Sequence, residues 1–245
     1  MKNNRILVTP VAYNECVKLK NVIERFLLSP VRKDVDYMVV DDGSTDGTSE
    51  LIQQYSDQGV MHLKHEQRQG VGSAIRTAIK YACENHYEIL VIMAGNDKDN
   101  PEEIPQLIDP ILKDNFDFVQ GSRYKGGKGI GGDMPFYRKI ATRIHPLLMS
   151  AFTGKKLTDT TNGFRAFRLA IFEDNRINID QDWLDKYELE PYLLFKAIAL
   201  NYRFTEAFVT KIYPPKKLGY TKMKPLIGWW SILRPVFYLG FRLKK

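Results

Sequence analysis

Two carboxylates, Asp97 and Asp99, follow a short apolar run in the stretch VIMAGNDKDNP, residues 91–101. The apolar run predicts the end of a buried strand, and the glycine, asparagines and charges after it predict a polar turn. Carboxylate oxygens are the ligands that Mg²⁺ and Mn²⁺ prefer, so the stretch is a candidate metal site. The alternative is a well-solvated turn before a helix that begins at Pro101.

A second acidic stretch, DDGSTDGT, spans residues 41–48 and also follows an apolar run. Asp41 and Asp42 stand at the expected strand end, and Ser44 or Thr45 can cap the helix that follows. Turn and cap would account for most of this stretch. Two adjacent carboxylates exceed what capping needs, and they could accept hydrogen bonds from a nucleobase and a ribose.

Two further polar stretches have the residue types of a ligand site. PVAYNE, residues 10–15, places Tyr13 at the exit of the first expected strand, where Asn14 could also simply cap a helix. QGVGSAIRTA, residues 69–78, has two glycines at an expected helix N-terminus, where backbone can come close to a phosphate. A Gly-x-Gly pattern is common, so this motif alone is weak evidence for a phosphate site.

The elements that must position these residues alternate along the first half of the chain. Apolar runs and helical periodicity predict strands and helices in turn, at 5–9, 15–28, 37–40, 46–57, 60–64, 71–84, 88–93, 101–113 and 116–121. Near-continuous apolar strands between amphipathic helices predict an α/β fold with a mostly parallel sheet and helices on both faces. The polar stretches fall at the carboxyl ends of the expected strands, the edge where such sheets bind ligands.

The second half is less regular. KGGKGIGGD, residues 125–133, predicts a flexible loop that could cover a site. Pro191 is expected to interrupt a helix. The remaining expected elements are helices at 135–152 and 183–200, a strand after the turn in 158–167 and an extended segment at 204–213.

Positive charge is concentrated at the C-terminal end. The net charge is +7, and residues 211–245 contain nine Lys and Arg but no Asp or Glu. We expect a catalytic domain over 1–215 and a basic, aromatic, amphipathic tail over 216–245. The apolar run of the tail is interrupted and too short to span a bilayer, but its composition suits an anionic membrane surface. The alternative is a helix packed on the domain. Nucleic-acid binding is not expected, because the remaining body has no basic recognition module.

The two cysteines, Cys16 and Cys83, have no cysteine or histidine at metal-ligand spacing and are interpreted as small apolar residues. The first residues lack the long apolar run of a secretory signal. Both features fit a reducing cytosol. We therefore expect a cytoplasmic protein that binds the cytosolic face of the membrane peripherally.

Together the motifs resemble the family 2 glycosyltransferases, which have the GT-A fold. The resemblance covers about the first 170 residues and rests on PVAYNE, VVDDGSTDGT, QGVGSAIRTA, GSRY (121–124) and TNGFRAF (161–167). Within this family, GSRY, the glycine-rich loop, Arg138 and TNGFRAF are most similar to the polyprenyl- and dolichol-phosphate sugar transferases.

The resemblance implies that a sugar moves from a UDP- or GDP-sugar, with inversion at the anomeric carbon, to a polyprenyl phosphate or another lipid-linked acceptor. It implies that Asp41 contacts the base and that Asp42 lies beside the ribose. The other implied nucleotide-binding residues are Pro10, Tyr13, Glu15, Arg68, Gly70 and Asn96. The residues implied near the acceptor and the phosphates are Arg123, Arg138, Thr161, Asn162 and Arg165.

One departure from the family pattern concerns the metal. The family has Asp-Ala-Asp where this chain has Ala94-Gly95-Asn96, so the usual metal carboxylates are replaced. The first hypothesis is that Asp97 or Asp99 takes a Mg²⁺ or Mn²⁺ ion together with Asn96. The second is that cations stabilise the leaving diphosphate without metal, for example Arg68, Arg76 or Arg123. The third is a chain that binds nucleotide-sugar without turnover.

The catalytic base has two candidates, Glu188 and Glu190 in YELEP, residues 187–191. They lie near the position of the family's acidic residue on the acceptor side, and they could equally be charges on a helix surface. A hydroxyl acceptor needs a carboxylate to take its proton, whereas a lipid phosphate is already ionised. A transferase to a sugar hydroxyl in surface-polysaccharide assembly is therefore the second interpretation. A non-catalytic nucleotide-sugar-binding protein and a nucleotidyltransferase are further ones, and the oligomeric state is open.

Overall fold

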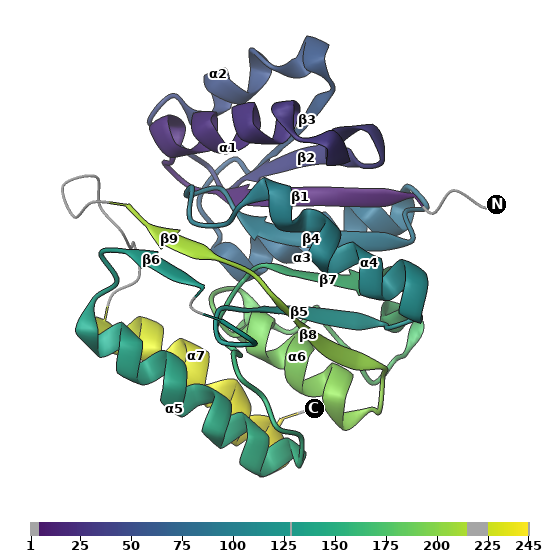
Figure 1. The fold of residues 1–245 in the computed structure, drawn as a ribbon, viewed down its shortest axis with the longest axis vertical. Coiled ribbons are helices and arrows are strands. Elements are labelled where there is room, and N and C mark those ends of the chain that lie inside the picture. Colours follow the sequence, from purple (N-terminus) through teal and green to yellow (C-terminus); the bar gives the residue numbers. More distant parts are fainter. Residues whose placement is uncertain (1–4, 128, 215–224, 245) are drawn as a thin grey trace.

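A seven-stranded sheet forms the centre of the protein in a computed structural model that describes residues 5–127, 129–214 and 225–244. Its strand order is β3-β2-β1-β4-β7-β5-β8 (Figure 1). All neighbouring strands pair in parallel except β7, which is antiparallel to both β4 and β5. The strands are β1 (Ile6–Ala12), β2 (Asp36–Asp41), β3 (Val60–Lys64), β4 (Ile89–Ala94), β5 (Phe118–Ser122), β7 (Arg165–Arg168) and β8 (Phe204–Phe208).

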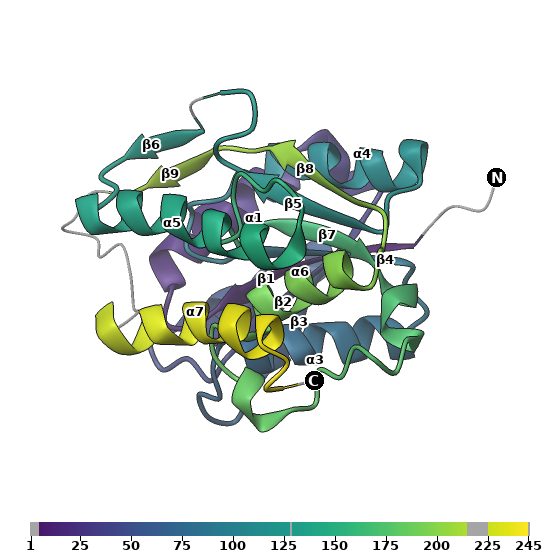
Figure 2. The same ribbon diagram turned by 90° about the horizontal axis from the view of Figure 1, so that it is seen from below.

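Helices cover both faces of this sheet, as the apolar strands predict. Ile6 and Val8 of β1 pack into one apolar cluster with α1, α2 and α4, whereas Leu7 packs into another with α3, α5, α6 and α7. Figure 2 shows α3, α6 and α7 on one side of the sheet and α4 on the other. The helices are α1 (Cys16–Leu28), α2 (Thr48–Gln53), α3 (Val71–Glu84), α4 (Ile104–Asp114), α5 (Phe136–Thr153), α6 (Leu189–Ala199) and α7 (Pro225–Gly240).

The second half differs most from expectation. The extended segment 204–213 is two strands, because its end, β9 (Lys211–Tyr213), leaves the main sheet and pairs with β6 (Ile130–Gly132) inside the glycine-rich loop. Helix α6 begins only at Leu189, so Pro191 lies in its first turn, where a missing N–H is tolerated, and does not break it.

Helix α7 packs on α5 and α6 rather than projecting from the domain, the second of the two arrangements that the sequence allows. Gly240 lets it approach α5 closely, since a Cβ there would stand 2.4 Å from the ring of Phe152. Val236 is fully buried. The boundary expected at 215 and 216 lies outside the described residues. None of the helices in the described ranges is long and apolar enough to cross a bilayer.

Candidate active site

A cavity of about 760 Å³ opens at the carboxyl ends of β1, β2 and β4. This volume lies within the range of small-molecule sites, and the position is the one expected for a ligand of a parallel sheet. Of the described residues, three acidic side chains line it, Glu15, Asp42 and Glu190, against seven basic ones. The basic ones are Lys18, Arg68, Lys98, Arg123, Arg138, Lys186 and Lys211. The excess of positive charge favours an anionic ligand.

Two strand-exit loops are joined to form one wall of this cavity. The backbone N–H of Asn14 donates to Ser44 Oγ (2.8 Å), and the N–H of Thr45 donates back to Asn14 Oδ1 (2.8 Å). The N–H of Glu15 donates to Thr48 Oγ1 (3.1 Å). Ser44 and Thr48 therefore bridge two loops, and neither Asn14 nor Ser44 acts as the helix cap that was considered.

Asp41 and Asp42 have different surroundings. Asp41 is fully buried, does not line the cavity, and accepts from Ser44 N (2.9 Å) and Ser49 Oγ (2.5 Å). Burial alone would raise the pKa of Asp41, but the His62 imidazole 3.9 Å away and the hydrogen bonds from Ser44 and Ser49 hold that pKa well below its usual range. Asp42 lines the cavity, and its carboxylate accepts from the backbone of Gln69 and Gly70. The structure thus presents Asp42, not Asp41, to a ligand.

Tyr13 and Arg68 form a shelf on the cavity wall, with the guanidinium 4.3 Å from the ring centroid. Such a flat cationic and aromatic surface suits a nucleobase. Glu15 also lines the cavity, and its Oε2 forms an ion pair with Lys18 Nζ (2.9 Å). Pro10 lies within β1 and is not among the lining residues.

The two glycines of QGVGS admit the chain's own backbone. A Cβ at Gly70 would stand 2.4 Å from the carbonyl oxygen of Asp185, and one at Gly72 would stand 2.0 Å from that of Leu184. The Asp185 carbonyl accepts from Ser73 N (3.0 Å) and so occupies the first turn of α3. The loop 184–186 therefore packs on this helix terminus, and the approach of a phosphate to it stays a prediction, since Gly70 also lines the cavity.

The loop after β4 directs its two carboxylates away from the cavity. Asp97, at φ +58°, accepts from Asn21 Nδ2 (3.1 Å) and Arg25 Nη1 (2.9 Å), both on α1. Asp99 is fully buried and accepts from Ala94 N (2.9 Å) and Lys211 Nζ (2.6 Å). Neither lines the cavity.

Lys98 and Asn96 are the side chains that this loop contributes to the cavity lining. Burial, together with the neighbouring positive charges of Lys211 and Arg138, lowers the pKa of Lys98 to about 7. The Oδ1 of Asn96 is buried and has no hydrogen-bond partner among the described residues.

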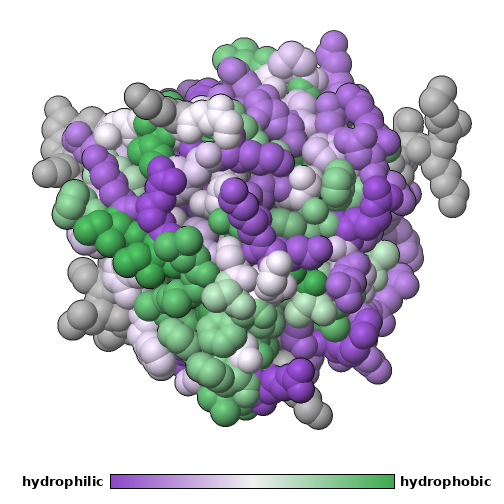
Figure 3. All heavy atoms as spheres, turned by 60° about the horizontal axis from the view of Figure 1, so that its bottom comes forward, coloured by the Kyte–Doolittle hydropathy of each residue, from purple (hydrophilic) through white to green (hydrophobic). Residues whose placement is uncertain are grey.

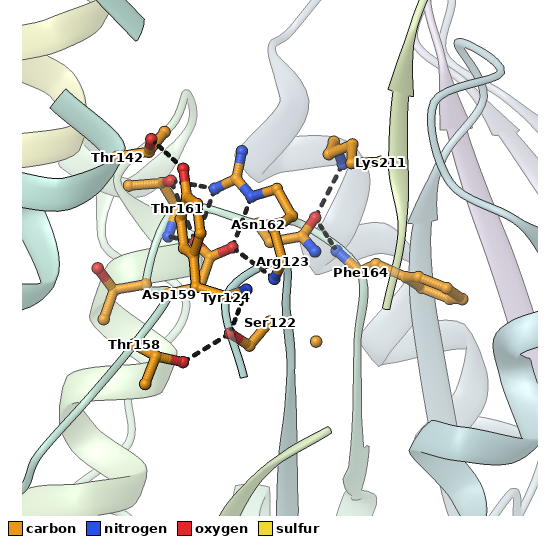
Figure 4. A network of polar contacts seen from close by, with 12 residues as sticks. Ser122, Arg123, Tyr124, Thr142, Thr158, Asp159, Thr161, Asn162, Phe164 and Lys211 are labelled. Carbon is orange, nitrogen blue, oxygen red and sulfur yellow. Dashed lines mark hydrogen bonds and ion pairs between the residues drawn. The ribbon is translucent and has the colours of Figure 1, made fainter. Parts of the chain in front are cut away.

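A buried ion-pair network holds the opposite wall (Figure 4). Arg123 donates from Nε and Nη2 to the two carboxylate oxygens of Asp159 (2.5 and 2.6 Å), and further to Thr161 Oγ1 and the hydroxyl of Tyr213. Burial would raise the pKa of Asp159, but the Arg123 charge and its hydrogen bonds lower it. Since its donors already have partners, Arg123 mainly positions Thr161 and Tyr213, while Arg138 lines the cavity beside the Tyr213 ring.

The predicted acceptor residues separate into lining and supporting side chains. Thr161 lines the cavity, whereas Asn162 and Arg165 are buried behind it. Arg165 donates to the backbone carbonyls of Glu190 (2.7 Å) and Asn162 (2.7 Å). Arg165 and Asn162 therefore position the residues that face the ligand.

Of the two candidate bases, Glu190 lines the cavity and Glu188 does not. Gly163 makes room for the Glu190 carboxylate, since a Cβ there would stand 2.7 Å from Oε1. Glu188 is buried and pairs with Arg234 of α7 at 2.5 Å. This pair anchors α7 against the start of α6.

Helix α7 completes the cavity wall. Gly228, Trp229, Ser231 and Ile232 line it, and Ser231 Oγ accepts from Tyr187 N (3.2 Å). Lys186, Tyr187 and these α7 residues were not expected from the sequence, because nothing in a basic aromatic tail signals which site it covers.

The residues present do not fit a divalent cation at the exit of β4. Asp97 and Asp99 are already bound to cationic side chains, and the positions at which the resemblance implies carboxylates hold Ala94 and Asn96. Among the described residues no three His, Cys, Asp or Glu side chains form a group that could hold a metal ion. The expected ligand set of Asn96, Asp97 and Asp99 is thus not assembled toward the cavity.

Comparison with known proteins identifies the family and agrees with the fold. Residues 8–176 match glycosyl transferase family 2, and the chain belongs to this family. It is a glycosyltransferase with the GT-A fold. An undecaprenyl-phosphate mannosyltransferase of Micrococcus luteus is 30% identical over 224 residues, which cover 89% of this chain and 87% of that protein. A UDP-N-acetylglucosamine–dolichyl-phosphate N-acetylglucosaminyltransferase of Methanococcus voltae is 31% identical over 175 residues, covering 66% of this chain and 68% of that protein.

A solved structure shows the same architecture. The glucosyl-3-phosphoglycerate synthase of Mycobacterium tuberculosis, in complex with Mn²⁺, UDP-glucose and phosphoglyceric acid, superposes with a TM-score of 0.64 at 21% identity. The match covers 96% of this chain and 80% of that one. At this level of identity the likeness shows the fold.

Proposed function

We propose that this protein transfers a sugar from a UDP- or GDP-sugar to a polyprenyl phosphate. The observation that carries the proposal is a cavity that, of the described residues, seven basic and three acidic side chains line together. A nucleotide-sugar and a lipid phosphate bring two anionic groups to one site, so their reaction requires such a surplus of positive charge. The relatives named for undecaprenyl- and dolichyl-phosphate support this acceptor.

The chemistry is a single displacement at the anomeric carbon. An oxygen of the lipid phosphate forms the new bond on the face opposite the nucleotide, and the bond to the diphosphate oxygen breaks with both electrons leaving on the nucleoside diphosphate. The configuration inverts. Since the phosphate nucleophile is already ionised, no proton has to be removed. The cavity-lining residues proposed to face these groups are Asp42, Arg138, Thr161 and Glu190.

A Mg²⁺ or Mn²⁺ ion is the cofactor that the family resemblance implies, and the Mn²⁺ complex of the mycobacterial synthase supports it. The surroundings of Asp97 and Asp99 do not support a metal ion there, because Arg25 and Lys211 already bind these carboxylates. A bound cation would stabilise charge on the leaving diphosphate.

We further propose that an exposed apolar surface on α5 and α7 meets the cytosolic face of an anionic membrane. On α5 it consists of Phe136, Tyr137, Ile140, Ile144 and Leu147, all between 41% and 76% exposed. Trp230 on α7 and Phe241 and Leu243 directly after α7 complete it. Figure 3 shows this apolar patch on the side that carries α5 and α7. Exposed Lys139 and Arg143 on the same helix suit anionic headgroups.

This membrane contact is tested by surface substitution, because removing α7 would open the cavity wall. Phe136→Asp with Leu147→Asp should abolish cosedimentation with phosphatidylglycerol vesicles. Leu28→Asp, at an equally exposed position on α1, should have no effect. Equal vesicle binding by all three proteins would contradict the proposal.

The acceptor class separates the proposal from its main rival, a hydroxyl acceptor, for which Glu190 would be the base. The wild type is incubated with labelled UDP- or GDP-sugars and polyprenyl phosphate, and label is counted in the organic phase before and after mild acid. We expect an acid-labile lipid product, with Glu190→Gln slowing its formation by less than about tenfold. An acid-stable product, with Glu190→Gln costing about 10²–10⁴ in rate, would establish the hydroxyl transferase instead. Glu102→Gln on the surface serves as the control, and nucleotide binding without any product would indicate a non-catalytic protein.

A further inference from the structure

The loop after β4 presents an ammonium group, that of Lys98, to the cavity. Lys98 stands between Asp97 and Asp99 in sequence, yet Lys98 lines the cavity and the two aspartates do not. The left-handed backbone at Asp97 lets its carboxylate reach Arg25 on α1. Asp99, two residues on, is turned inward to Lys211. The acidic loop is therefore neutralised by its surroundings and adds a cation to the cavity.

A second ammonium group is fixed beside the first. Lys211 lies at the start of β9, and the next residue along, Ile212, donates its N–H to the carbonyl oxygen of Lys98 at 3.0 Å. Lys211 Nζ is held by Asp99 Oδ1 (2.6 Å) and Asn162 Oδ1 (2.8 Å), which Figure 4 shows in part. An ammonium has three N–H donors, and the described residues engage two of those on Lys211. Since Lys211 lines the cavity, its remaining donor can meet a ligand there.

We propose that Lys98 and Lys211 bind the diphosphate of the nucleotide-sugar in place of a divalent cation. The inference rests on the proposed function and defines how that site holds its donor. Two ammonium groups carry the formal charge of one Mg²⁺ ion when Lys98 is protonated, although Asp99 offsets part of the charge on Lys211. A bound diphosphate favours the protonated form of Lys98, because a nearby opposite charge raises the pKa of an amine. When the sugar leaves, charge accumulates on the diphosphate, and fixed cations in a water-poor site stabilise it.

The three arginines that the sequence suggested for the diphosphate have other partners. Arg123 is bound to Asp159, and Arg76 donates to Asp185 Oδ1 (2.8 Å) and to the carbonyl of Ile179 (2.7 Å) without lining the cavity. Arg68 covers Tyr13 on the nucleobase shelf. Lys98, from the loop after β4, and Lys211, from the start of β9, thus both line the cavity at the sheet edge where the donor is expected.

The first experiment is calorimetric titration of the full chain with UDP and GDP, and with uridine and guanosine, in Mg²⁺, in Mn²⁺ and in EDTA. We expect the preferred diphosphate to bind with an affinity that changes less than about threefold between metal and EDTA. Affinity that is lost in EDTA and restored by Mn²⁺ would overturn the inference, and so would the absence of any nucleotide binding.

The second experiment removes the charge. Lys98→Met should weaken diphosphate binding by about tenfold or more, while nucleoside binding changes less than about twofold. Lys98→Arg should recover part of the loss, and Lys113→Met, at an exposed position on α4, should change nothing. Lys211→Met is combined with Asp99→Asn, so that no buried carboxylate is left unpaired, and should also weaken diphosphate binding selectively. Unchanged diphosphate affinity in Lys98→Met, with nucleoside binding intact, would refute the assignment.

The two failures are distinguishable. Transfer that requires metal would refute the role of the lysines and leave the glycosyltransferase proposal standing. Diphosphate binding that resists EDTA and depends on Lys98, without transfer to any acceptor, would support the role of the lysines and refute the proposed sugar transfer.

Discussion

The loops that follow β2 and β4 are both rich in aspartate, and both end at the same edge of the sheet. After β2, the carboxylate of Asp41 accepts from a backbone N–H and a hydroxyl, and that of Asp42 accepts from two backbone N–H groups and lies 2.9 Å from the imidazole of His65. After β4, Asp97 and Asp99 are bound by Arg25 and Lys211. Neutral donors leave a carboxylate its negative charge, whereas a cation cancels it. The net charge of a strand-exit loop therefore depends on the side chains that its carboxylates bind, and not on the acidic motif alone.

The largest expected effect comes from removing the cation after β4. Lys211→Met leaves the fully buried carboxylate of Asp99 without its counter-ion, which should lower the free energy of unfolding by about 3–5 kcal/mol. Urea denaturation measures this loss. Adding Asp99→Asn should restore most of it, and a double variant no more stable than Lys211→Met would show that the two side chains are not coupled.

A smaller effect is expected from the buried carboxylate after β2. Asp41→Asn keeps the shape but loses a charged acceptor of the Ser44 N–H, at a cost of about 2 kcal/mol at neutral pH. Because the pKa of Asp41 is lower in the folded than in the unfolded protein, its contribution is complete above about pH 4 and is lost as the pH falls further. The stability difference between wild type and variant should therefore shrink in acid. A difference independent of pH would contradict this account.

The link between the first two loops should matter less. Ser44→Ala removes the acceptor of the Asn14 N–H and should cost about 1 kcal/mol, since that group is only partly buried. The same variant should weaken nucleotide binding modestly, because Tyr13 is adjacent to Asn14. Thermal unfolding and calorimetry measure the two effects, and a stabilised variant would contradict the bridging role.

The smallest effect is expected at Arg25. Its ion pair with Asp97 is partly exposed, with 36% and 23% of the two side chains accessible, so Arg25→Gln should cost less than about 1 kcal/mol. The variant also tests metal binding, because it removes the cation that pairs with the Asp97 carboxylate. If diphosphate binding in Arg25→Gln becomes stimulated by Mn²⁺ while the wild type is not, the contrast between the two loops is sharpened. Loss of several kcal/mol would show that the pair is structural.

Much of the first half could be predicted from sequence, because its strands and helices are signalled by local apolar patterns. That patterning also placed PVAYNE, DDGSTDGT and GNDKDNP at one edge of the sheet. The partners of their side chains could not be predicted, since Arg25 lies 72 residues from Asp97 and Lys211 lies 112 residues from Asp99.

The second half depends on such distant partners throughout. Glu206 of β8 accepts from the backbone N–H groups of Thr158 and Asp159, and Asp159 in turn holds Arg123. The apolar periodicity of the sequence does not predict these contacts, because it reports only local structure. The glycines of QGVGS do mark a close backbone approach, as the sequence predicts, but the approaching group is the loop 184–186 of the same chain.

The most direct test is diffraction from crystals grown with the preferred nucleoside diphosphate and Mn²⁺, with data collected at the manganese absorption edge. The account predicts diphosphate oxygens about 3 Å from the ammonium groups of Lys98 and Lys211, with no anomalous peak beside them. An anomalous peak bridging the diphosphate to Asn96, Asp97 or Asp99 would contradict it.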